Sequence, residues 1–356
     1  MKFIHIADVH WGMKPDADKP WGRERAQAIR DTFTEIVRQA RLRDVDLLLI
    51  AGDLFHRQPL LRDLKEVNYL FSTIPSVRIV LIAGNHDRIR PNSAMMSFTW
   101  CPNVTWIQDE ELTSVFFEDI NTEILGFSYH TAEIRETRVD HVSPPDTRRI
   151  HILLAHGGDA SHLPLDKPAL SRSGFSYTAL GHIHKPELAP DLTWAYPGSP
   201  EPLDKTETGQ HGMIVGEISP VTFRVTSLEF IPMAQLQYIP LVIHVTPATT
   251  NGELLARIRA EVKKRGMEHI YRFRIRGMRD PDIEFDLEPV SNSIQVIETV
   301  DESEPRYDFS RLFAEHPGDM IGFYIRALQK ENASPVEKKA LYYGIDALLR
   351  TTDERS

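Results

Sequence analysis

Five short segments of the sequence combine metal-ligating side chains with a nearby glycine, and each follows a run of apolar residues. Carboxylate, amide and imidazole groups are suitable ligands for divalent Mn, Fe or Zn. One Asp-x-His or Gly-His-x-His alone is more often incidental, but five such segments in order indicate a metal centre. The candidate ligands are Asp8, His10, Asp53, Asn85, His156, His182 and His184.

The apolar runs that precede these residues predict buried β-strands. FIHI, DLLLI, RIVLI, HILLA and YTALG are short and rich in Ile, Leu and Val. Helix-period segments at 23–43 and 60–72 separate the first three runs, and strand–helix–strand order implies parallel units with functional loops at the C-terminal strand ends. Shorter strands expected over 100–128 and 194–231 favour an α/β fold of two packed mixed sheets flanked by helices.

Proline-containing segments divide the chain into three expected parts. Prolines at 232 and 240 mark one boundary, and the acidic stretch DESEPRYD at 301–308 is an expected linker. The large domain should cover 1–235, a small α+β capping domain 236–300, and the linker with C-terminal helices 301–356. Apolar stripes on helices at 309–329 and 335–349 should either pack on the protein's own core or bind a partner.

A basic stretch interrupts an otherwise acidic chain. The net charge of −10 argues against wholesale coating of nucleic acid, but leaves room for a local basic groove. In the predicted strand YRFRIR, alternate side chains share a face, which places Arg272, Arg274 and Arg276 together. With Lys263 and Lys264 they are candidate contacts for DNA phosphates, and a solvated sheet face is the alternative.

The cysteine content and the hydropathy of the sequence indicate the cellular compartment in which the protein is expected. The single Cys101 suits a reducing environment, and the polar N-terminal segment is unlike a signal peptide. Apolar runs fall short of the roughly 20 residues that span a bilayer. We expect a cytoplasmic protein without membrane association.

The ordered motifs D-x-H, G-D, G-N-H-D, H and G-H-x-H resemble those of the calcineurin-like metallophosphoesterase superfamily, over residues 8–184. The resemblance implies two metal ions that lie roughly 3.5–4 Å apart and are bridged by Asp53. Together the two ions would hold a hydroxide nucleophile. Mn²⁺ is the expected metal, with Fe²⁺, Mg²⁺ and Zn²⁺ as alternatives. One ion would be completed by Asp8, His10 and His184, and the other by Asn85, His156 and His182.

The segment GDLFH narrows the resemblance to the SbcD-type DNA repair nucleases. The Ser/Thr phosphatases of the superfamily have G-D-x-x-D-R-G and G-N-H-E instead. The resemblance implies that His56 takes part in exonuclease action, although a packing role at the pocket rim is the alternative. It further implies that His86 hydrogen-bonds the phosphoryl oxygen or protonates the leaving alkoxide, with Asp87 orienting its ring.

The implied function is a DNA exonuclease or endonuclease in DNA repair and recombination. The resemblance further implies that the substrate is a DNA end and that the capping domain positions the DNA. It also implies that the C-terminal helices bind an SMC-like, SbcC-type ATPase and that the protein forms a homodimer. One alternative is a phosphodiesterase or phosphatase for small molecules or phosphoproteins, which GDLFH and the cap disfavour. The other is a DNA-end-binding scaffold for the ATPase, which the complete ligand set disfavours.

Overall fold

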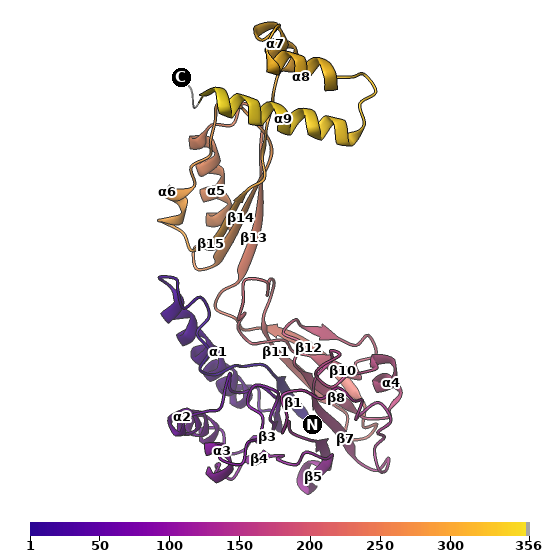
Figure 1. The fold of residues 1–356 in the computed structure, drawn as a ribbon. Helices are drawn as coiled ribbons and strands as arrows, with labels where there is room; N and C mark the ends of the chain where they lie inside the picture. Colours follow the sequence, from indigo (N-terminus) through magenta and orange to yellow (C-terminus); the bar gives the residue numbers. More distant parts are fainter. Residues whose placement is uncertain (354–356) are drawn as a thin grey trace. The chain divides into compact units, whose positions relative to one another are not determined.

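The computed structural model describes residues 1–353, which form two compact units (Figure 1). The first comprises Met1–Ile239 with Glu268–Ile270, and the second comprises Pro240–Met267 with the chain from Tyr271 onward. The division falls a few residues beyond the sequence boundary at 235, because strand β13 (Tyr238–Val245) runs across it. The functions assigned to these parts stay predictions.

The first unit contains a six-stranded mixed sheet in the order β12-β11-β1-β2-β3-β4. Strands β1 to β4 are mutually parallel, whereas β11 is antiparallel to β1 and β12 is antiparallel to β11. The strands are β1 (Lys2–Ile6), β2 (Leu47–Ala51), β3 (Arg78–Ile82), β4 (Val104–Trp106), β11 (Gly212–Ile218) and β12 (Val225–Pro232).

A second six-stranded sheet of this unit has the order β5-β6-β7-β8-β10-β9. Its central strands β6, β7, β8 and β10 are parallel, and antiparallel β5 and β9 close the two edges. The strands are β5 (Thr113–Phe117), β6 (Thr122–Gly126), β7 (Ile150–His156), β8 (Tyr177–Gly181), β9 (Glu187–Leu188) and β10 (Trp194–Tyr196).

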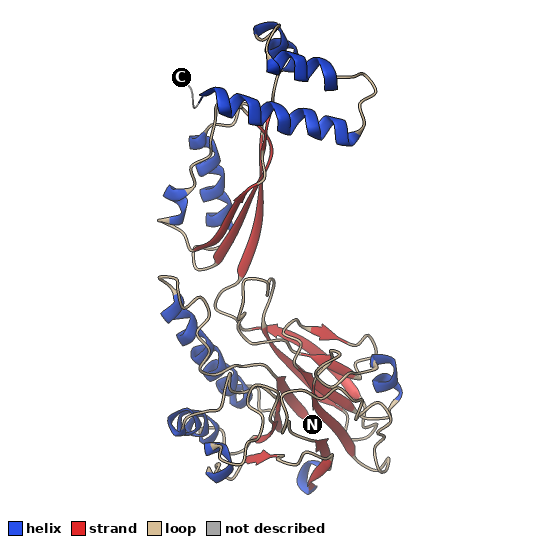
Figure 2. Ribbon diagram, in the orientation of Figure 1, coloured by secondary structure: helices blue, strands red, loops and turns tan. Residues whose placement is uncertain are grey.

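The two sheets pack face to face, as the sequence predicted. Apolar side chains of β2 and β3, such as Leu49 and Ile82, share one buried cluster with Ile152 and Leu154 of β7. The outer face of the first sheet is covered by helices α1 (Gly22–Leu42) and α2 (Leu61–Ser72), visible in Figure 2. Shorter helical segments are α3 (Ala94–Ser97), η1 (Glu118–Ile120) and α4 (Lys167–Arg172).

A buried polar contact fixes α1 against the turn after β10. Arg25 is fully buried and its guanidinium lies 3.4 Å from the Glu201 carboxylate, while also donating to the carbonyl of Pro202. Glu201 accepts from the Thr32 hydroxyl at 2.6 Å. The segment YPGSPE therefore has a structural task in this unit, because a buried charge needs such partners.

The second unit combines a small sheet with helices. The sheet has the order β13-β14-β15, in which β14 and β15 are parallel, and β16 pairs with β14 within the segment expected to be a linker. Thr250 and Glu253 form a capping box that starts α5, which explains its sharp beginning. These elements are α5 (Asn251–Arg265), β14 (Ile270–Arg279), α6 (Glu288–Ser291), β15 (Val296–Asp301) and β16 (Glu304–Pro305).

The expected helix over 309–329 is wrong, because the chain breaks it in two. Helix α7 (Phe309–Glu315) ends before His316-Pro317-Gly318, and Asp319 caps the start of α8 (Met320–Leu328) through its carboxylate. Proline and glycine together disfavour a continuous helix here. Helix α9 (Pro335–Asp353) follows. Within residues 1–353, each helix is too short or too polar to cross a bilayer.

Candidate metal centre

All seven candidate ligands lie at C-terminal strand ends of the first unit. Asp8 and His10 follow β1, Asp53 follows β2 and Asn85 follows β3, all in the first sheet. His156 is the last residue of β7, and the Gly181-His182-Ile183-His184 turn follows β8, both in the second sheet. The parallel strands of two packed sheets therefore direct both sets of side chains toward one place.

The backbone at this place is strained and closely packed. Asp8, His10, Asp53 and His182 have positive φ angles of 53°, 49°, 51° and 93°, which non-glycine residues rarely adopt. A Cβ at Gly84 would lie 2.2 Å from an Asp53 carboxylate oxygen, so only glycine fits there. Such strain persists only when the surrounding structure enforces it, and it concentrates at functional sites.

The ligating atoms form two adjoining groups. Atoms of Asp8, His10 and His184 lie within 4.8 Å of one another, as do atoms of Asp8, Asp53 and His156. Asp8 is common to both groups, and Asp53 adjoins both, because its Oδ2 is 3.7 Å from Nε2 of His10 and 3.4 Å from Nε2 of His156. The position of Asp53 suits a carboxylate that bridges two ions.

Polar atoms of three candidate ligands converge where a cation would sit. Nδ1 of His156 donates to the Ala51 carbonyl at 2.8 Å, so Nε2 is the ring atom that faces the other candidate ligands and binds a metal after losing its proton. That Nε2 lies 3.0 Å from the amide oxygen Oδ1 of Asn85 and 3.4 Å from Asp53 Oδ2. Two oxygens therefore face this nitrogen, and positive charge is favourable there, either as the proton of His156 or as a metal ion that replaces it. The residues present therefore fit the metal ions of this kind of site.

The electrostatics of the buried carboxylates point the same way. Burial acts to raise the pKa of Asp53, but the neighbouring His156 and His10 outweigh it and hold that pKa well below its usual range. Burial acts to lower the pKa of His156, but the Asp53 carboxylate outweighs burial and raises this pKa to about 9. Burial lowers the pKa of His10 well below its ordinary value, which keeps that ring neutral. The centre thus has an anionic carboxylate that attracts cations.

Two carboxylates that the sequence analysis missed orient candidate histidines. Oδ2 of Asp159 accepts from Nε2 of His182 at 2.7 Å, and Oε1 of Glu207 accepts from Nδ1 of His184 at 2.6 Å. Each contact leaves the opposite ring nitrogen, Nδ1 of His182 and Nε2 of His184, as the ligating atom. The motif HGGD, which ends in Asp159, was a usable signal, whereas no motif marks Glu207.

His86 and His56 lie side by side next to the candidate ligands. Their rings stack with centroids 5.2 Å apart, and Nδ1 of His56 is 3.3 Å from Nδ1 of His10. Nδ1 of His86 donates to the backbone carbonyl of His56 at 3.0 Å, which leaves Nε2 of His86 for contact with a substrate. Burial lowers the pKa of His56, with the charge of His86 as the next cause.

The carboxylate of Asp87 contacts backbone groups of two loops, and its part in orienting His86 stays a prediction. Its buried carboxylate accepts the backbone N–H groups of Phe55 and Gly84, at 3.0 and 2.7 Å. The ring of His86 is oriented by the carbonyl of His56. Asp87 therefore ties together the loops that follow β2 and β3, and its burial raises its pKa to about 7.

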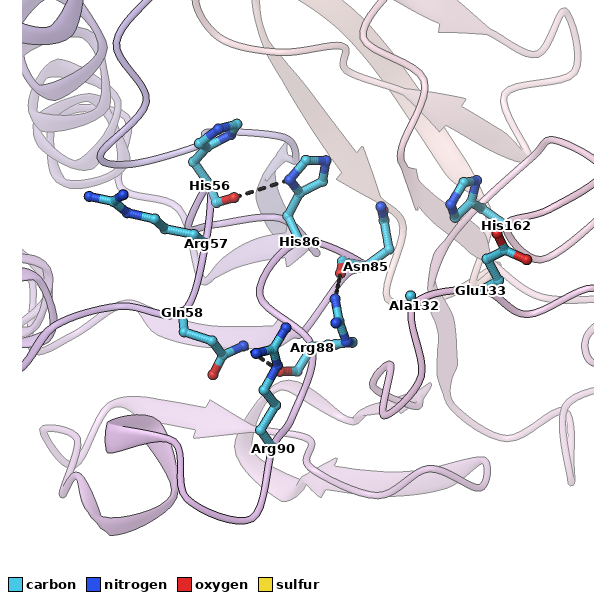
Figure 3. A pocket seen from close by; sticks show the side chains of 10 residues that line it. All are labelled: His56, Arg57, Gln58, Asn85, His86, Arg88, Arg90, Ala132, Glu133 and His162. Atoms are coloured by element: carbon cyan, nitrogen blue, oxygen red, sulfur yellow. Dashed lines mark hydrogen bonds between the residues drawn. The ribbon is translucent and has the colours of Figure 1, made fainter.

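A cavity of about 450 Å³ opens beside these histidines (Figure 3). Asn85 is the candidate ligand that reaches its wall, and the remaining lining is mostly polar or basic. Its lining residues are His56, Arg57, Gln58, Asn85, His86, Arg88, Arg90, Ala132, Glu133 and His162.

In the second unit, the arginines predicted to contact DNA share one face but are paired with acids. Arg272 pairs with Glu298, and Arg274 and Arg276 both pair with Glu302, at 3.2 and 2.6 Å. The row is therefore largely neutralised. Lys263 and Lys264 are exposed at the last turn of α5.

The comparisons with known proteins agree with this geometry. The family model described as calcineurin-like phosphoesterase matches residues 1–186, and the chain belongs to this family of metallophosphoesterases, which bind two metal ions.

Distant relatives carry more specific names. The DNA double-strand break repair protein Mre11 of Methanocaldococcus jannaschii is 30% identical over 220 residues, covering 58% of each chain. That of Methanopyrus kandleri is 26% identical over 238 residues, covering 59% of this chain and 52% of the relative. The uncharacterized metallophosphoesterase YhaO of Bacillus subtilis is 28% identical over 236 residues, covering 60% and 56%. The chain spans about half the length of the curated relatives it matches.

Removing the orienting carboxylates should weaken metal binding. We expect Asp159→Ala and Glu207→Ala each to reduce Mn²⁺ affinity by about 10- to 100-fold, because the histidine ring is no longer held in its ligating tautomer. Titration calorimetry of the metal-free protein measures this directly. Glu187→Ala is the control, since Glu187 pairs with Lys167 at the surface. Wild-type affinity in both test variants would show that these carboxylates do not support the ligands.

Proposed function

We propose that the chain is a metal-dependent DNA nuclease of the SbcD type, which hydrolyses phosphodiesters at DNA ends during repair. The observation that carries the proposal is the position of His56. This residue distinguishes GDLFH from the phosphatase motif, and its ring stacks on His86 at the wall of the cavity. The relatives named DNA double-strand break repair protein support the same substrate.

The candidate ligands would hold two divalent ions, with Mn²⁺ as the proposed metal. When bound, such ions polarise the phosphoryl group and lower the pKa of water toward neutrality. Asp53 would contribute to both ions, since its Oδ2 adjoins both His10 and His156. Asp159 and Glu207 would keep His182 and His184 in the ligating tautomer.

His86 is the proposed general acid. Its Nδ1 donates to the His56 carbonyl, so Nε2 is the ring nitrogen that can give a proton to the substrate. The ring is exposed at the cavity, where the oxygen that leaves the phosphorus can reach it. The rings of His56, His86 and His10 are in mutual contact, and His56 would position the scissile phosphate against the other two.

Digestion of end-labelled duplex and hairpin DNA with Mn²⁺ or Mg²⁺ tests the proposal. His86→Ala should lower kcat by about 10²–10⁴-fold, the usual contribution of a positioned acid. His56→Ala should lose exonuclease activity. His141→Ala is a matched control, because His141 is exposed and outside the cavity lining.

The same assay separates the alternatives. The nuclease proposal would be wrong if the protein hydrolysed bis(4-nitrophenyl) phosphate or a phosphomonoester efficiently but left DNA uncut. That result would favour a small-molecule phosphoesterase. DNA binding without any hydrolysis would favour a scaffold. Full exonuclease activity of His56→Ala would remove that residue from the mechanism.

We also propose that the α5 end of the second unit contacts DNA. Lys263 and Lys264, rather than the paired arginine row, supply the exposed positive charge. The double variant Lys263→Gln/Lys264→Gln should weaken duplex binding and reduce the slope of log affinity against log salt by about 2. Lys338→Gln/Lys339→Gln, an exposed pair on α9, is the control. Equal salt slopes for both double variants would rule the contact out.

The C-terminal helices are the proposed site for an SMC-like ATPase. The apolar stripes seen in the sequence pack against each other, since Ile321 and Ile325 share a cluster with Leu341 and Ile345. Other large apolar side chains remain exposed, namely Met320, Phe323, Val336 and Tyr343 at 66, 54, 77 and 64%. An exposed apolar surface of this kind is typical of a partner site.

Charge placed on this surface should abolish ATPase binding. We expect Phe323→Glu/Tyr343→Glu to lose co-purification with the SbcC-type ATPase of the same organism, because a carboxylate cannot be buried unpaired at an apolar interface. Tyr69→Glu, at an exposed tyrosine of α2, should retain it. Retained binding by the double variant, with an unchanged circular dichroism spectrum, would contradict the proposal.

A further inference from the structure

Three arginines line the cavity beside His86, and their charges are not neutralised by acids. Throughout residues 1–353, the ion pairs do not include Arg57, Arg88 or Arg90, in contrast to the paired arginine row of β14. Among the residues of the lining, Glu133 is the carboxylate, and it pairs with Arg135 at 2.7 Å. The cavity therefore concentrates uncompensated positive charge next to the proposed acid.

Two of these arginines, Arg88 and Arg90, lie on the solvent-exposed side of the loop that follows β3. Burial alternates from His86 to Arg90: Asp87 and Ile89 are buried, whereas His86, Arg88 and Arg90 are more exposed. The N–H of Ile89 donates to the Tyr129 carbonyl at 2.7 Å, which anchors the segment. His86, Arg88 and Arg90 therefore share the more exposed side of this loop, where all three line the cavity.

The guanidinium of Arg88 is held in place before any ligand binds. Its NH1 donates to the backbone carbonyl of Asn85 at 3.2 Å, and Gln58 donates to the carbonyl of Arg88 at 2.7 Å. Figure 3 shows Arg88 and Arg90 below Asn85, while the side chain of Arg57 extends away from them. Two guanidiniums that line one cavity repel each other, and an anion between them relieves that repulsion.

We propose that this cavity binds a second phosphate of the substrate, adjacent to the phosphate that is cleaved, through Arg88 and Arg90. Guanidinium groups match phosphate oxygens through paired, charge-assisted hydrogen bonds. The inference rests on the proposed function and deepens it. It makes the preferred substrate a strand with at least two neighbouring phosphates, rather than an isolated diester.

Binding of a bisphosphate tests the second subsite without any need for DNA cleavage. Titration calorimetry on the Mn²⁺-loaded protein would compare thymidine 3′,5′-bisphosphate with thymidine 5′-monophosphate. The wild type should prefer the bisphosphate by about tenfold or more, the size of one charge-assisted hydrogen bond. Arg88→Gln/Arg90→Gln should bring the ratio of the two affinities close to one.

Single and control variants keep the test decisive. Arg90→Gln alone should also reduce the ratio, and because Arg90 is exposed, this change does not disturb the Asn85 loop. Arg62→Gln, at an exposed arginine of α2 outside the lining, should leave the ratio at the wild-type value. Equal affinity of the wild type for both nucleotides, or an unchanged ratio in both cavity variants, would overturn the inference. Failure to cut DNA would count against the nuclease proposal alone.

Discussion

The arrangement of the first unit depends on three polar side chains that converge on one point. Nε2 of His156 lies 3.0 Å from Oδ1 of Asn85 and 3.4 Å from Oδ2 of Asp53, and the Asp53 carboxylate raises the pKa of this imidazole to about 9. Positive charge stabilises this convergence, either as the proton of His156 or as a metal ion in its place. The left-handed backbone at Asp53 and the glycine at 84, which lets Asp53 approach closely, are what this convergence requires of the chain.

Acidic groups around the centre divide between two tasks. Asp159 and Glu207 each accept from a histidine and so determine which nitrogen faces the centre. Asp87 and Glu201 instead satisfy buried backbone and side-chain donors that hold loops and α1 in place. Sequence position does not reveal the difference, because Asp87 lies inside the motif that carries His86 and Asn85, whereas Glu207 lies in no motif.

Local patterns were sufficient for the parts of the fold that local forces determine. The strand–turn segments around Asp8, Asp53 and Asn85 were predicted because apolar runs and glycines encode them directly. Long-range contacts were not predictable in this way. The pairing of Arg274 with Glu302 depends on register across β14 and β15, and the orientation of His86 depends on a carbonyl thirty residues earlier. The break between α7 and α8 was predictable from Pro317 and Gly318, although helical periodicity masked it.

The origin of the candidate ligands in two separate sheets has a thermodynamic consequence. Asp53 belongs to the first sheet and His156 to the second, and their facing atoms are 3.4 Å apart. An ion bound by both would act as a cross-link between the sheets that exists only in the folded chain. By linkage, each tenfold increase in free ion above its dissociation constant would add about 1.4 kcal/mol to the free energy of unfolding. The stability of this unit would then follow the metal supply of its surroundings.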